Sequence, residues 1–108
     1  MKKGEIWFVD LLSTKGHEQE GFRPAIVVAV AEANICLVIP CTSNIQTLRF
    51  PHTVEISPSK KNGLETISVG LIFQLRAIDR TRLKRRIGEL EEEKVKEINS
   101  IVKKLLQL

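Results

Sequence analysis

The sequence predicts a mainly β fold (α+β): a small, strongly bent sheet or barrel, followed by one C-terminal α-helix. Short segments rich in β-branched and aromatic residues recur up to residue 90, and turn-forming residues separate them. From residue 91 onward, apolar residues recur at spacings of three and four, which is the period of an amphipathic helix. The chain has 108 residues and is most simply one domain, residues 1–108, large enough to bury a core without metal or disulfides.

The first part of the chain predicts three strands. Residues 4–11 (GEIWFVDL) are rich in β-branched and aromatic side chains, and a polar loop follows over residues 12–22. Residues 24–31 are almost wholly apolar, as expected for a strand covered on both faces, and residues 35–40 continue as another apolar strand. Because only a short turn at residues 33–34 separates the two apolar strands, they should form an antiparallel hairpin.

Turns and short strands alternate in the middle of the chain. Small hydroxyl residues cluster at residues 41–44 and predict a turn after the third strand. Residues 52–56 alternate weakly and predict a strand, and residues 57–63 form a turn-rich loop with an Asn-Gly step. Residues 66–73 predict a further strand, in which Gly70 is a candidate bulge.

The last elements lead into the helix. Residues 74–79 are expected to carry the preceding strand outward, and Asp79 is a candidate cap for one helical turn at residues 79–83. Residues 85–90 predict the last strand. Acidic residues at the start of the helix and lysines near its end match the helix dipole. Its apolar stripe consists of Val95, Ile98, Ile101, Val102, Leu105 and Leu106.

Composition narrows the function classes. Hydrophobic residues make up 43% and charged residues 28%, as in soluble globular proteins, and no apolar stretch approaches the roughly 20 residues of a membrane span. The N-terminal residues lack a signal-peptide core, so a cytoplasmic protein without a membrane partner is expected. The two cysteines, Cys36 and Cys41, form no Cys-x-x-Cys pair and are predicted to be buried free thiols. With no nucleotide-binding glycine loop, neither a metal nor another cofactor is expected.

The charge distribution is mild evidence for a polyanionic partner. The formal net charge is +4, and six basic residues fall within residues 76–86. A plain solvated face explains such a run equally well. With four phenylalanines and one tryptophan, a broad base-stacking platform is not expected, although one or two aromatics beside a groove would suffice for a short strand.

Arg23 is the strongest single candidate for a functional side chain. It lies where the polar loop meets the apolar strand, and Pro24 biases its backbone toward extended geometry. Loops give access and strands give position, so a guanidinium at this junction is well placed for binding or catalysis. The competing interpretation is an ion pair with a nearby carboxylate, Glu18 or Glu20.

Several segments, taken in order, carry a family resemblance: GEIWFVDL at 4–11, GHEQ at 16–19, RPA at 23–25, TS at 42–43, PHTVEI at 51–56, GL and SV at 63–64 and 68–69, and QLRAID at 74–79. No single segment is specific, but their order and spacing over one chain are. With these segments the chain resembles the MazF/PemK family of toxin ribonucleases over nearly its whole length.

The resemblance implies a compact SH3-like β-barrel with a C-terminal helix that works as a homodimer. It also implies metal-independent cleavage of single-stranded RNA at short motifs, and neutralisation by a cognate antitoxin. The expected antitoxin is MazE-like: an acidic, partly disordered segment that folds on contact and blocks the RNA site.

The resemblance also implies roles for particular residues. Arg23 and Thr42 match the catalytic arginine and hydroxyl, while the predicted RNA-binding residues are His17, Glu18, Gln19, Ser43, His52, Gln74 and Arg76. Ser43 and Gln74 could equally cap turns or strand ends. The hairpin at residues 24–40 is shorter than is usual in the family, and Cys41 stands where an apolar residue is typical. These departures concern specificity more than activity.

The chemistry expected of these residues is attack by the RNA 2′-hydroxyl on the adjacent phosphorus. Arg23 offers forked donors to the phosphoryl oxygens, and Thr42 can donate a hydrogen bond to the same group or to the leaving oxygen. An arginine with its ordinary pKa above about 12 is a poor general base. His17 and His52 are the candidates for proton transfer, and a structural or binding role is open for each.

Two other functions remain open at this point. One is a protein inhibitor on the same barrel, like the gyrase-poisoning CcdB relatives. That class acts through its C-terminal residues, but this chain ends in Leu-Leu-Gln-Leu without the terminal tryptophan expected of such a poison. The other is an inactive barrel that only binds RNA, because catalysis depends on sub-ångström placement of Arg23 and Thr42.

Overall fold

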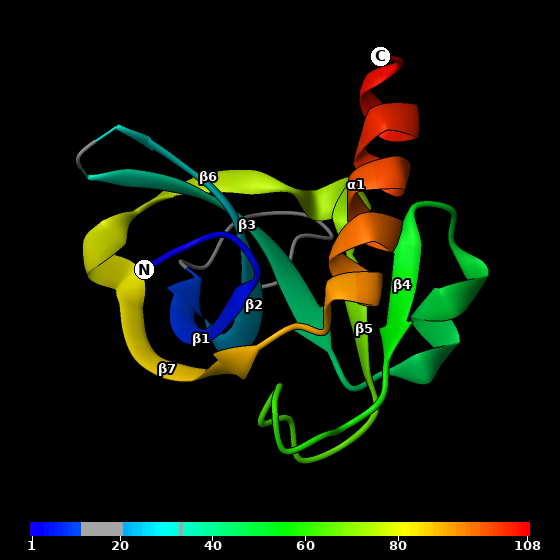
Figure 1. The fold of residues 1–108 in the computed structure, drawn as a ribbon, viewed down its shortest axis with the longest axis horizontal. Coiled ribbons are helices and arrows are strands. Elements are labelled where there is room, and N and C mark those ends of the chain that lie inside the picture. Colours follow the sequence, from blue (N-terminus) through cyan, green and yellow to red (C-terminus); the bar gives the residue numbers. More distant parts are fainter. Residues whose placement is uncertain (12–20, 33) are drawn as a thin grey trace.

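The computed structural model describes residues 1–11, 21–32 and 34–108, and it has the mainly β fold with one C-terminal helix that the sequence predicts (Figure 1). The 3₁₀ helices are labelled η. The elements in chain order are β1 Glu5–Leu11, β2 Gly21–Glu32, β3 Ile35–Thr42, η1 Ile45–Arg49, β4 Thr53–Ile56, β5 Ser68–Leu71, η2 Ile72–Gln74, β6 Arg76–Asp79, η3 Arg80–Arg82, β7 Leu83–Glu89 and α1 Glu92–Leu106.

The strands form one antiparallel sheet in the order β4-β5-β3-β2-β1-β7, with β6 added beside β3. The predicted hairpin of β2 and β3 is confirmed, with Ala25 opposite Pro40 at its inner end. From Cys41 onward, β3 pairs with β5. Among the described residues β4 and β7 are not paired with each other, so the bent sheet stays open.

Two buried clusters make up the core, one on each face of β2. Ile26 belongs to the cluster that the helix covers, whereas its neighbours Ala25 and Val27 belong to the other. This explains the apolar run in the sequence, because the middle of β2 is covered on both faces. The prediction is wrong for the outer end of the predicted strand, where residues 30 and 31 are exposed.

Helix α1 packs its apolar stripe on the core. Ile98 is buried, and Val95, Ile101, Val102 and Leu105 are partly buried against the same cluster. The predicted stripe is wrong at its last position, because Leu106 is exposed. Within the described part of the chain, no helix is both long enough and apolar enough to cross a membrane.

The largest differences from the predicted strand boundaries lie at the start of β2 and the end of β3. β2 already begins at Gly21, so residues 21–22 belong to the strand and not to the loop. The turn predicted at residues 41–44 begins only at Ser43, because Cys41 and Thr42 continue β3. Pairing with β5 outweighs the local preference of a hydroxyl residue for a turn.

The segment after the loop is more divided than predicted. β5 ends at Leu71, and residues 74–79, expected to prolong it, contain a separate strand that pairs with β3. Gly70 makes no bulge, since it keeps register with both neighbouring strands. A Cβ at this position would lie 2.9 Å from Cγ1 of Val54, so close strand packing explains the glycine.

The remaining strands and the helical turn after Asp79 follow the sequence, whereas the 3₁₀ helix η1 at Ile45–Arg49 was not predicted. The strands predicted at residues 4–11, 52–56 and 85–90 are present as β1, β4 and β7. Asp79 caps η3 as expected, because its Oδ1 accepts a hydrogen bond from the backbone N–H of Thr81 (2.9 Å).

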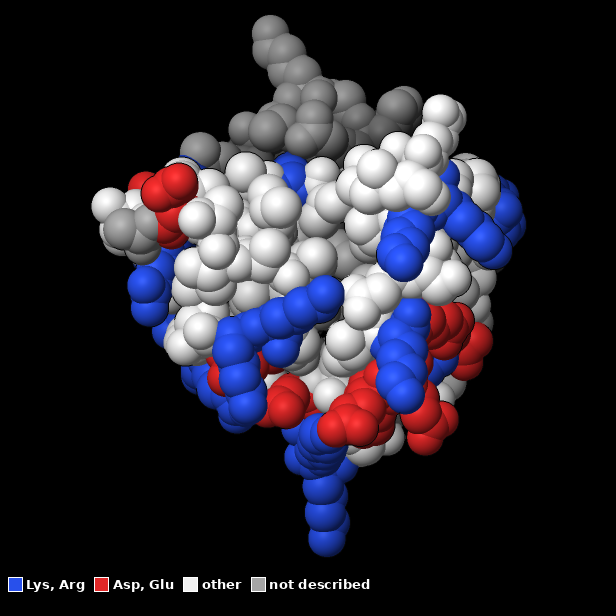
Figure 2. All heavy atoms as spheres, turned by 45° about the horizontal axis from the view of Figure 1, so that its top comes forward, with Lys and Arg blue, Asp and Glu red and all other residues white. Residues whose placement is uncertain are grey.

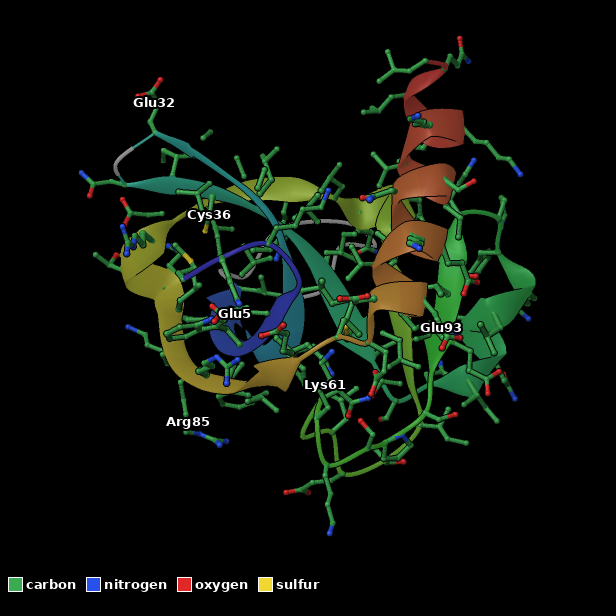
Figure 3. All side chains as sticks on the ribbon, viewed as in Figure 1. Glu5, Glu32, Cys36, Lys61, Arg85 and Glu93 are labelled. Carbon is green, nitrogen blue, oxygen red and sulfur yellow. The ribbon has the colours of Figure 1, made fainter. Side chains whose placement is uncertain are left out.

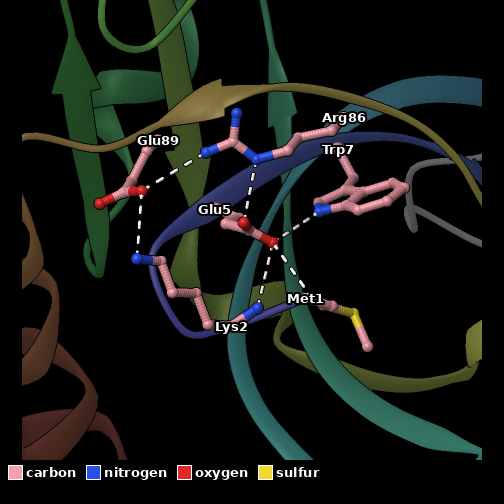
Figure 4. Close-up of polar contacts among 6 residues, drawn as sticks. All are labelled: Met1, Lys2, Glu5, Trp7, Arg86 and Glu89. Carbon is pink, nitrogen blue, oxygen red and sulfur yellow. Dashed lines mark hydrogen bonds and ion pairs between the residues drawn. The ribbon is translucent and has the colours of Figure 1, made fainter.

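A buried carboxylate ties β1 to β7 (Figure 4). Glu5 accepts hydrogen bonds from Trp7 Nε1 (3.1 Å), the backbone N–H of Lys2 (3.0 Å) and Arg86 Nε (2.9 Å). Burial alone would raise the pKa of Glu5, but these donors outweigh it and lower the pKa to about 2. Glu5 is therefore ionised and fully engaged across the physiological range.

Candidate active site

A pocket of about 310 Å³ lies where β2 and β3 separate. β3 pairs with β2 only as far as Pro40, so the first residues of β2 and the last residues of β3 are not joined to each other. The walls come from these strand ends, from β1 and β7, and from residues 63–66 with the start of β5. Arg23, Thr42 and Ser43 all line this pocket.

Arg23 is held on a regular strand. It lies opposite Val9 of β1, and Pro24 follows it opposite Phe8. The side chain is half-buried. Pairing with β1 and the restriction imposed by Pro24 together fix the backbone of Arg23, which lines the pocket.

Thr42 ends β3 and is only 8% exposed. Its Oγ1 accepts a hydrogen bond from the backbone N–H of Asn44 (3.2 Å). Ala25 of β2 lies opposite Pro40 of β3 in the antiparallel pair. Arg23 is two residues before Ala25 and Thr42 is two residues after Pro40, so the same register places Arg23 across from Thr42. The pocket therefore combines a guanidinium with a hydroxyl group that still carries its own hydrogen, a donor set suited to the oxygens of a phosphate.

The wall opposite these strand ends is built on Asn62, whose side chain is fully buried. Its Oδ1 accepts from the backbone N–H groups of Ser59 and Leu64 (both 3.0 Å), and its Nδ2 donates to Glu91 Oε1 (3.2 Å). Glu91 Oε2 accepts from Ser59 Oγ (2.6 Å), which is the main reason why the pKa of Glu91 is lowered. These bonds fasten the loop to the start of helix α1.

The same wall lies directly against β7. Gly63 has φ +69°, and a Cβ there would be 2.3 Å from the carbonyl oxygen of Ile87. Only glycine allows the loop backbone to approach β7 this closely. Residues 63–66 therefore have a defined position at the pocket.

The cysteines are free and buried, as predicted. Cys41 lines the pocket, but burial raises the pKa of its thiol to about 12. It stays protonated near neutral pH and is not a nucleophile. Across residues 1–11, 21–32 and 34–108 no group of three or more His, Cys, Asp or Glu residues could hold a metal ion.

The structure does not bring all predicted site residues to the pocket. His17, Glu18 and Gln19 lie outside the described residues. The lining does not include the other three predicted RNA-binding residues, which are His52, Gln74 and Arg76.

Each of these three occupies another part of the fold. His52 has φ +59° just before β4, and its carbonyl accepts from the backbone N–H of Phe73 (3.2 Å). Gln74 ends η2, and Arg76 begins β6 opposite Val38. Their predicted contacts with RNA remain predictions.

The basic run at residues 76–86 is largely engaged within the fold. Arg82 Nη1 donates to a backbone carbonyl of β1 (3.1 Å), and Arg86 Nε donates to Glu5 (2.9 Å). On the face shown in Figure 2, basic side chains are interspersed with acidic ones. Within the run, Arg85 is the residue that lines the pocket, so the run is not one continuous RNA-binding surface.

Sequence reasoning missed the aromatic wall of the pocket, formed by Phe8 and Phe22 beside Arg85. The two phenylalanines are separated by the loop in the chain, and their proximity depends on the register between β1 and β2. The sequence has only four phenylalanines, and two of them, Phe8 and Phe22, fall in the strands on either side of the loop. This placement was the signal that could have pointed to the pocket.

Comparison with known proteins identifies the family. A profile of the PemK-like, MazF-like toxins of type II toxin–antitoxin systems matches residues 2–106. A Staphylococcus saprophyticus protein named endoribonuclease MazF is 33% identical over 94% of this chain and 88% of its own length. A Bacillus subtilis protein named endoribonuclease EndoA is 34% identical over 100% of this chain and 96% of its own.

A solved structure agrees with this assignment. The crystal structure of MazF from Deinococcus radiodurans superposes with a TM-score of 0.83 at 25% identity, covering 100% of this chain and 97% of the other. The matching profile spans nearly the whole chain, and both named relatives are more than 30% identical. The chain therefore belongs to the PemK-like, MazF-like toxin family of type II toxin–antitoxin systems.

Proposed function

We propose that this chain, as a MazF-like endoribonuclease toxin, uses residues 1–108 as one domain to cleave single-stranded RNA in the cytoplasm, with Arg23 and Thr42 as catalytic residues. The observation that carries the proposal is the meeting of these two side chains in one pocket at the point where β2 and β3 separate. The relatives with more than 30% identity are named endoribonucleases, which supports RNA as the substrate.

The proposed reaction uses the nucleophile that RNA itself carries. The 2′-hydroxyl oxygen attacks the adjacent phosphorus in line, the bond from phosphorus to the 5′ oxygen breaks, and the products are a 2′,3′-cyclic phosphate and a 5′-hydroxyl. One proton leaves the 2′-hydroxyl and one reaches the 5′ oxygen. Arg23 stabilises negative charge on the phosphoryl oxygens, and Thr42 donates to the phosphate or to the leaving oxygen. No metal is required, because the guanidinium supplies the positive charge.

Binding along the strand involves the pocket and residues outside it. Ser43 is exposed and follows Thr42 directly, so it suits a nucleotide next to the scissile phosphate. His52, Gln74 and Arg76 lie outside the pocket, so their proposed contacts are with more distant nucleotides. His17 and His52 remain the candidates for proton transfer, with Glu18 and Gln19 beside His17 as proposed RNA contacts.

A cognate antitoxin and a second copy of the chain are the proposed protein partners. A solved structure of MazE with MazF from Deinococcus radiodurans shares this fold, with a TM-score of 0.74 at 23% identity. Arg23 and Arg85 make the pocket attractive to an acidic segment, which would compete with RNA for the same positive charges. We propose that the antitoxin inhibits by this competition and that the active form is a homodimer.

The decisive test is incubation of wild type and Arg23→Ala with a long single-stranded RNA in excess EDTA. We expect discrete cuts with 5′-hydroxyl ends in wild type and a loss on the order of 10²-fold or more in the variant. Arg80→Ala is the matched control, because Arg80 is exposed in η3 and does not line the pocket. Cuts that survive Arg23→Ala would remove Arg23 from the mechanism. A folded wild type that cuts no RNA would favour an RNA-binding or inhibitory barrel.

A further inference from the structure

Three neighbouring strands place a cation and two phenyl rings together at the pocket. Phe8 of β1 lies directly opposite Arg85 of β7 and opposite Pro24 of β2, and Phe22 is the second residue of β2, two residues before Pro24. Side chains at opposite and diagonal positions of paired antiparallel strands lie within reach of one another on one face of the sheet. The three groups come from segments that are far apart in the sequence.

Their geometry is that of a stack. The rings of Phe8 and Phe22 have centroids 5.9 Å apart and planes inclined by 18°. The guanidinium carbon of Arg85 lies 5.6 Å from the centroid of the Phe8 ring, within the range of a cation–π contact. In Figure 3 Arg85 extends outward from β7. The order of the stack is therefore Arg85, Phe8, Phe22.

Phe22, at the outer end of the stack, is exposed to solvent. Phe22 is 58% exposed, whereas Phe8 is partly buried between its two neighbours. Core packing does not explain a phenyl ring with more than half of its surface exposed, and an exposed aromatic ring beside a basic groove is suited to stacking on a base. All three residues line the pocket that also holds Arg23 and Thr42.

We propose that Phe22, supported by Phe8 and Arg85, is a base-stacking subsite for a nucleotide that flanks the scissile phosphate. This inference depends on the proposed ribonuclease function. Phe22 and Arg23 line the same pocket, so a phosphate on Arg23 brings the base of its own nucleotide or of the next one near the ring. Every base has a π face, and stacking on an aromatic side chain is worth about 5- to 150-fold in affinity. The guanidinium of Arg85 makes the same wall attractive to the negatively charged backbone.

The test compares cleavage kinetics of wild type, Phe22→Ala, Phe22→Leu and Phe22→Trp. The substrate is a short RNA that carries the sequence cut by wild type. We expect Phe22→Ala to raise KM on the order of tenfold with little change in kcat, because stacking binds the substrate and the transition state equally. Phe22→Leu should behave like Phe22→Ala, since it keeps apolar volume but has no π face. Phe22→Trp should retain wild-type kinetics.

Phe50→Ala is the matched control. Phe50 is 43% exposed, has the guanidinium of Arg49 5.0 Å from its ring centroid, and lies 6.0 Å from the ring of Phe73, but it does not line the pocket. Its removal should leave KM unchanged. The thermal midpoint of each variant shows whether the fold is intact, and truncation of an exposed ring should change it little.

Removal of single bases from the RNA locates the subsite. An abasic nucleotide at the stacking position should raise KM for wild type but not for Phe22→Ala, because that variant has already lost the same contact. The inference is wrong if Phe22→Ala cleaves like wild type, if Phe22→Leu retains full activity, or if Phe22→Ala weakens only antitoxin binding.

Failure of the ribonuclease proposal is recognisable separately. If wild type cuts no RNA, the proposed function fails, and fluorescence anisotropy with short labelled RNAs still tests the stacking surface. A tenfold weaker binding by Phe22→Ala than by Phe50→Ala would then support the subsite. Equal binding by both variants would overturn it.

Discussion

Thr42 combines a structural contact with a proposed chemical role in one hydroxyl group. Its oxygen accepts from the backbone N–H of Asn44 (3.2 Å), so the turn after β3 holds the side chain in place. A hydroxyl that accepts one hydrogen bond keeps its own hydrogen for donation. Removal of the hydroxyl group therefore affects both stability and cleavage, and the two effects have to be measured separately.

Thr42→Val should abolish most cleavage while the protein remains folded. The variant keeps the branched shape but loses the hydroxyl, so we expect about 1 kcal/mol lower stability and a rate loss of roughly 10²-fold. Thr42→Ser should cleave RNA. Thr47→Val is the control, because Thr47 Oγ1 donates to the carbonyl oxygen of Asn44 in the same turn (2.7 Å) but does not line the pocket. Equal losses of cleavage in both valine variants would contradict a chemical role for Thr42.

Glu5 gives the fold a predictable response to acid. The pKa of Glu5 is about 2 in the folded chain, against an ordinary value of 4.5, so the unfolded chain binds the proton more readily. The ionised carboxylate stabilises the fold fully above pH 4.5, and this contribution is lost as the pH falls toward 2.

Glu5→Gln should remove this pH dependence. The variant removes the Glu5 charge from Arg86 Nε, while Arg86 Nη2 keeps its contact with Glu89 (3.4 Å). We expect a free energy of unfolding lower by roughly 1–3 kcal/mol at pH 6 and a smaller difference from wild type near pH 3. Urea unfolding at the two pH values measures both. The exposed Glu55 on β4 serves as the control in Glu55→Gln. A difference that does not shrink at low pH would show that the carboxylate charge is not the source.

At the scale of elements, the loop at residues 57–64 acts as a spacer between helix α1 and the pocket. Asn62 closes the loop on itself and bonds to Glu91, the residue that precedes the helix. Gly63 lets the loop approach β7. One side of the pocket is therefore positioned by hydrogen bonds that involve no pocket-lining side chain.

Asn62→Ala should destabilise the fold strongly for a single substitution. It leaves the backbone N–H groups of Ser59 and Leu64 without their acceptor, so we expect a loss of about 2–4 kcal/mol in the free energy of unfolding. Chemical denaturation measures it. Asn34→Ala, at an exposed turn position, should change stability by less than about 0.5 kcal/mol. A small loss in Asn62→Ala would show that water replaces the amide.

At the scale of the whole molecule, the pocket results from the change of partner along β3. This strand pairs with β2 up to Pro40 and with β5 from Cys41, so the sheet divides beside Thr42. Buried clusters on both faces of β2 hold the two parts together. A rigid core thus surrounds an opening that is lined by strand ends and one loop.

The role of each basic residue also depends on the tertiary structure. The basic run is the most conspicuous charge feature of the sequence, but the fold uses Arg82 and Arg86 for internal contacts. Arg23, an isolated arginine in the sequence, lies with Arg85 at the pocket. Local charge density was therefore a weaker guide than the strand junction.

Much of the fold could be predicted because local patterns carry it. The strands at β1, β2, β3 and β7 and the helix follow from their apolar periodicity, and the Asp79 cap follows from its position before a helical turn. The division of residues 66–79 into β5, η2 and β6 could not be predicted, because β6 is defined by pairing with β3, about forty residues earlier. Likewise, the local sequence predicts a turn at Thr42, whereas its pairing with Val69 places it on a strand.

Most strands, the C-terminal helix and the family could be predicted from the sequence, and so could the candidate pair Arg23 and Thr42, because these predictions depend on local periodicity and on ordered short segments. The tertiary structure decided which side chains share the pocket: it brought Phe8, Phe22 and Arg85 to Arg23 and left His52 outside. Register between strands determines such neighbours, and register depends on residues distant in the chain.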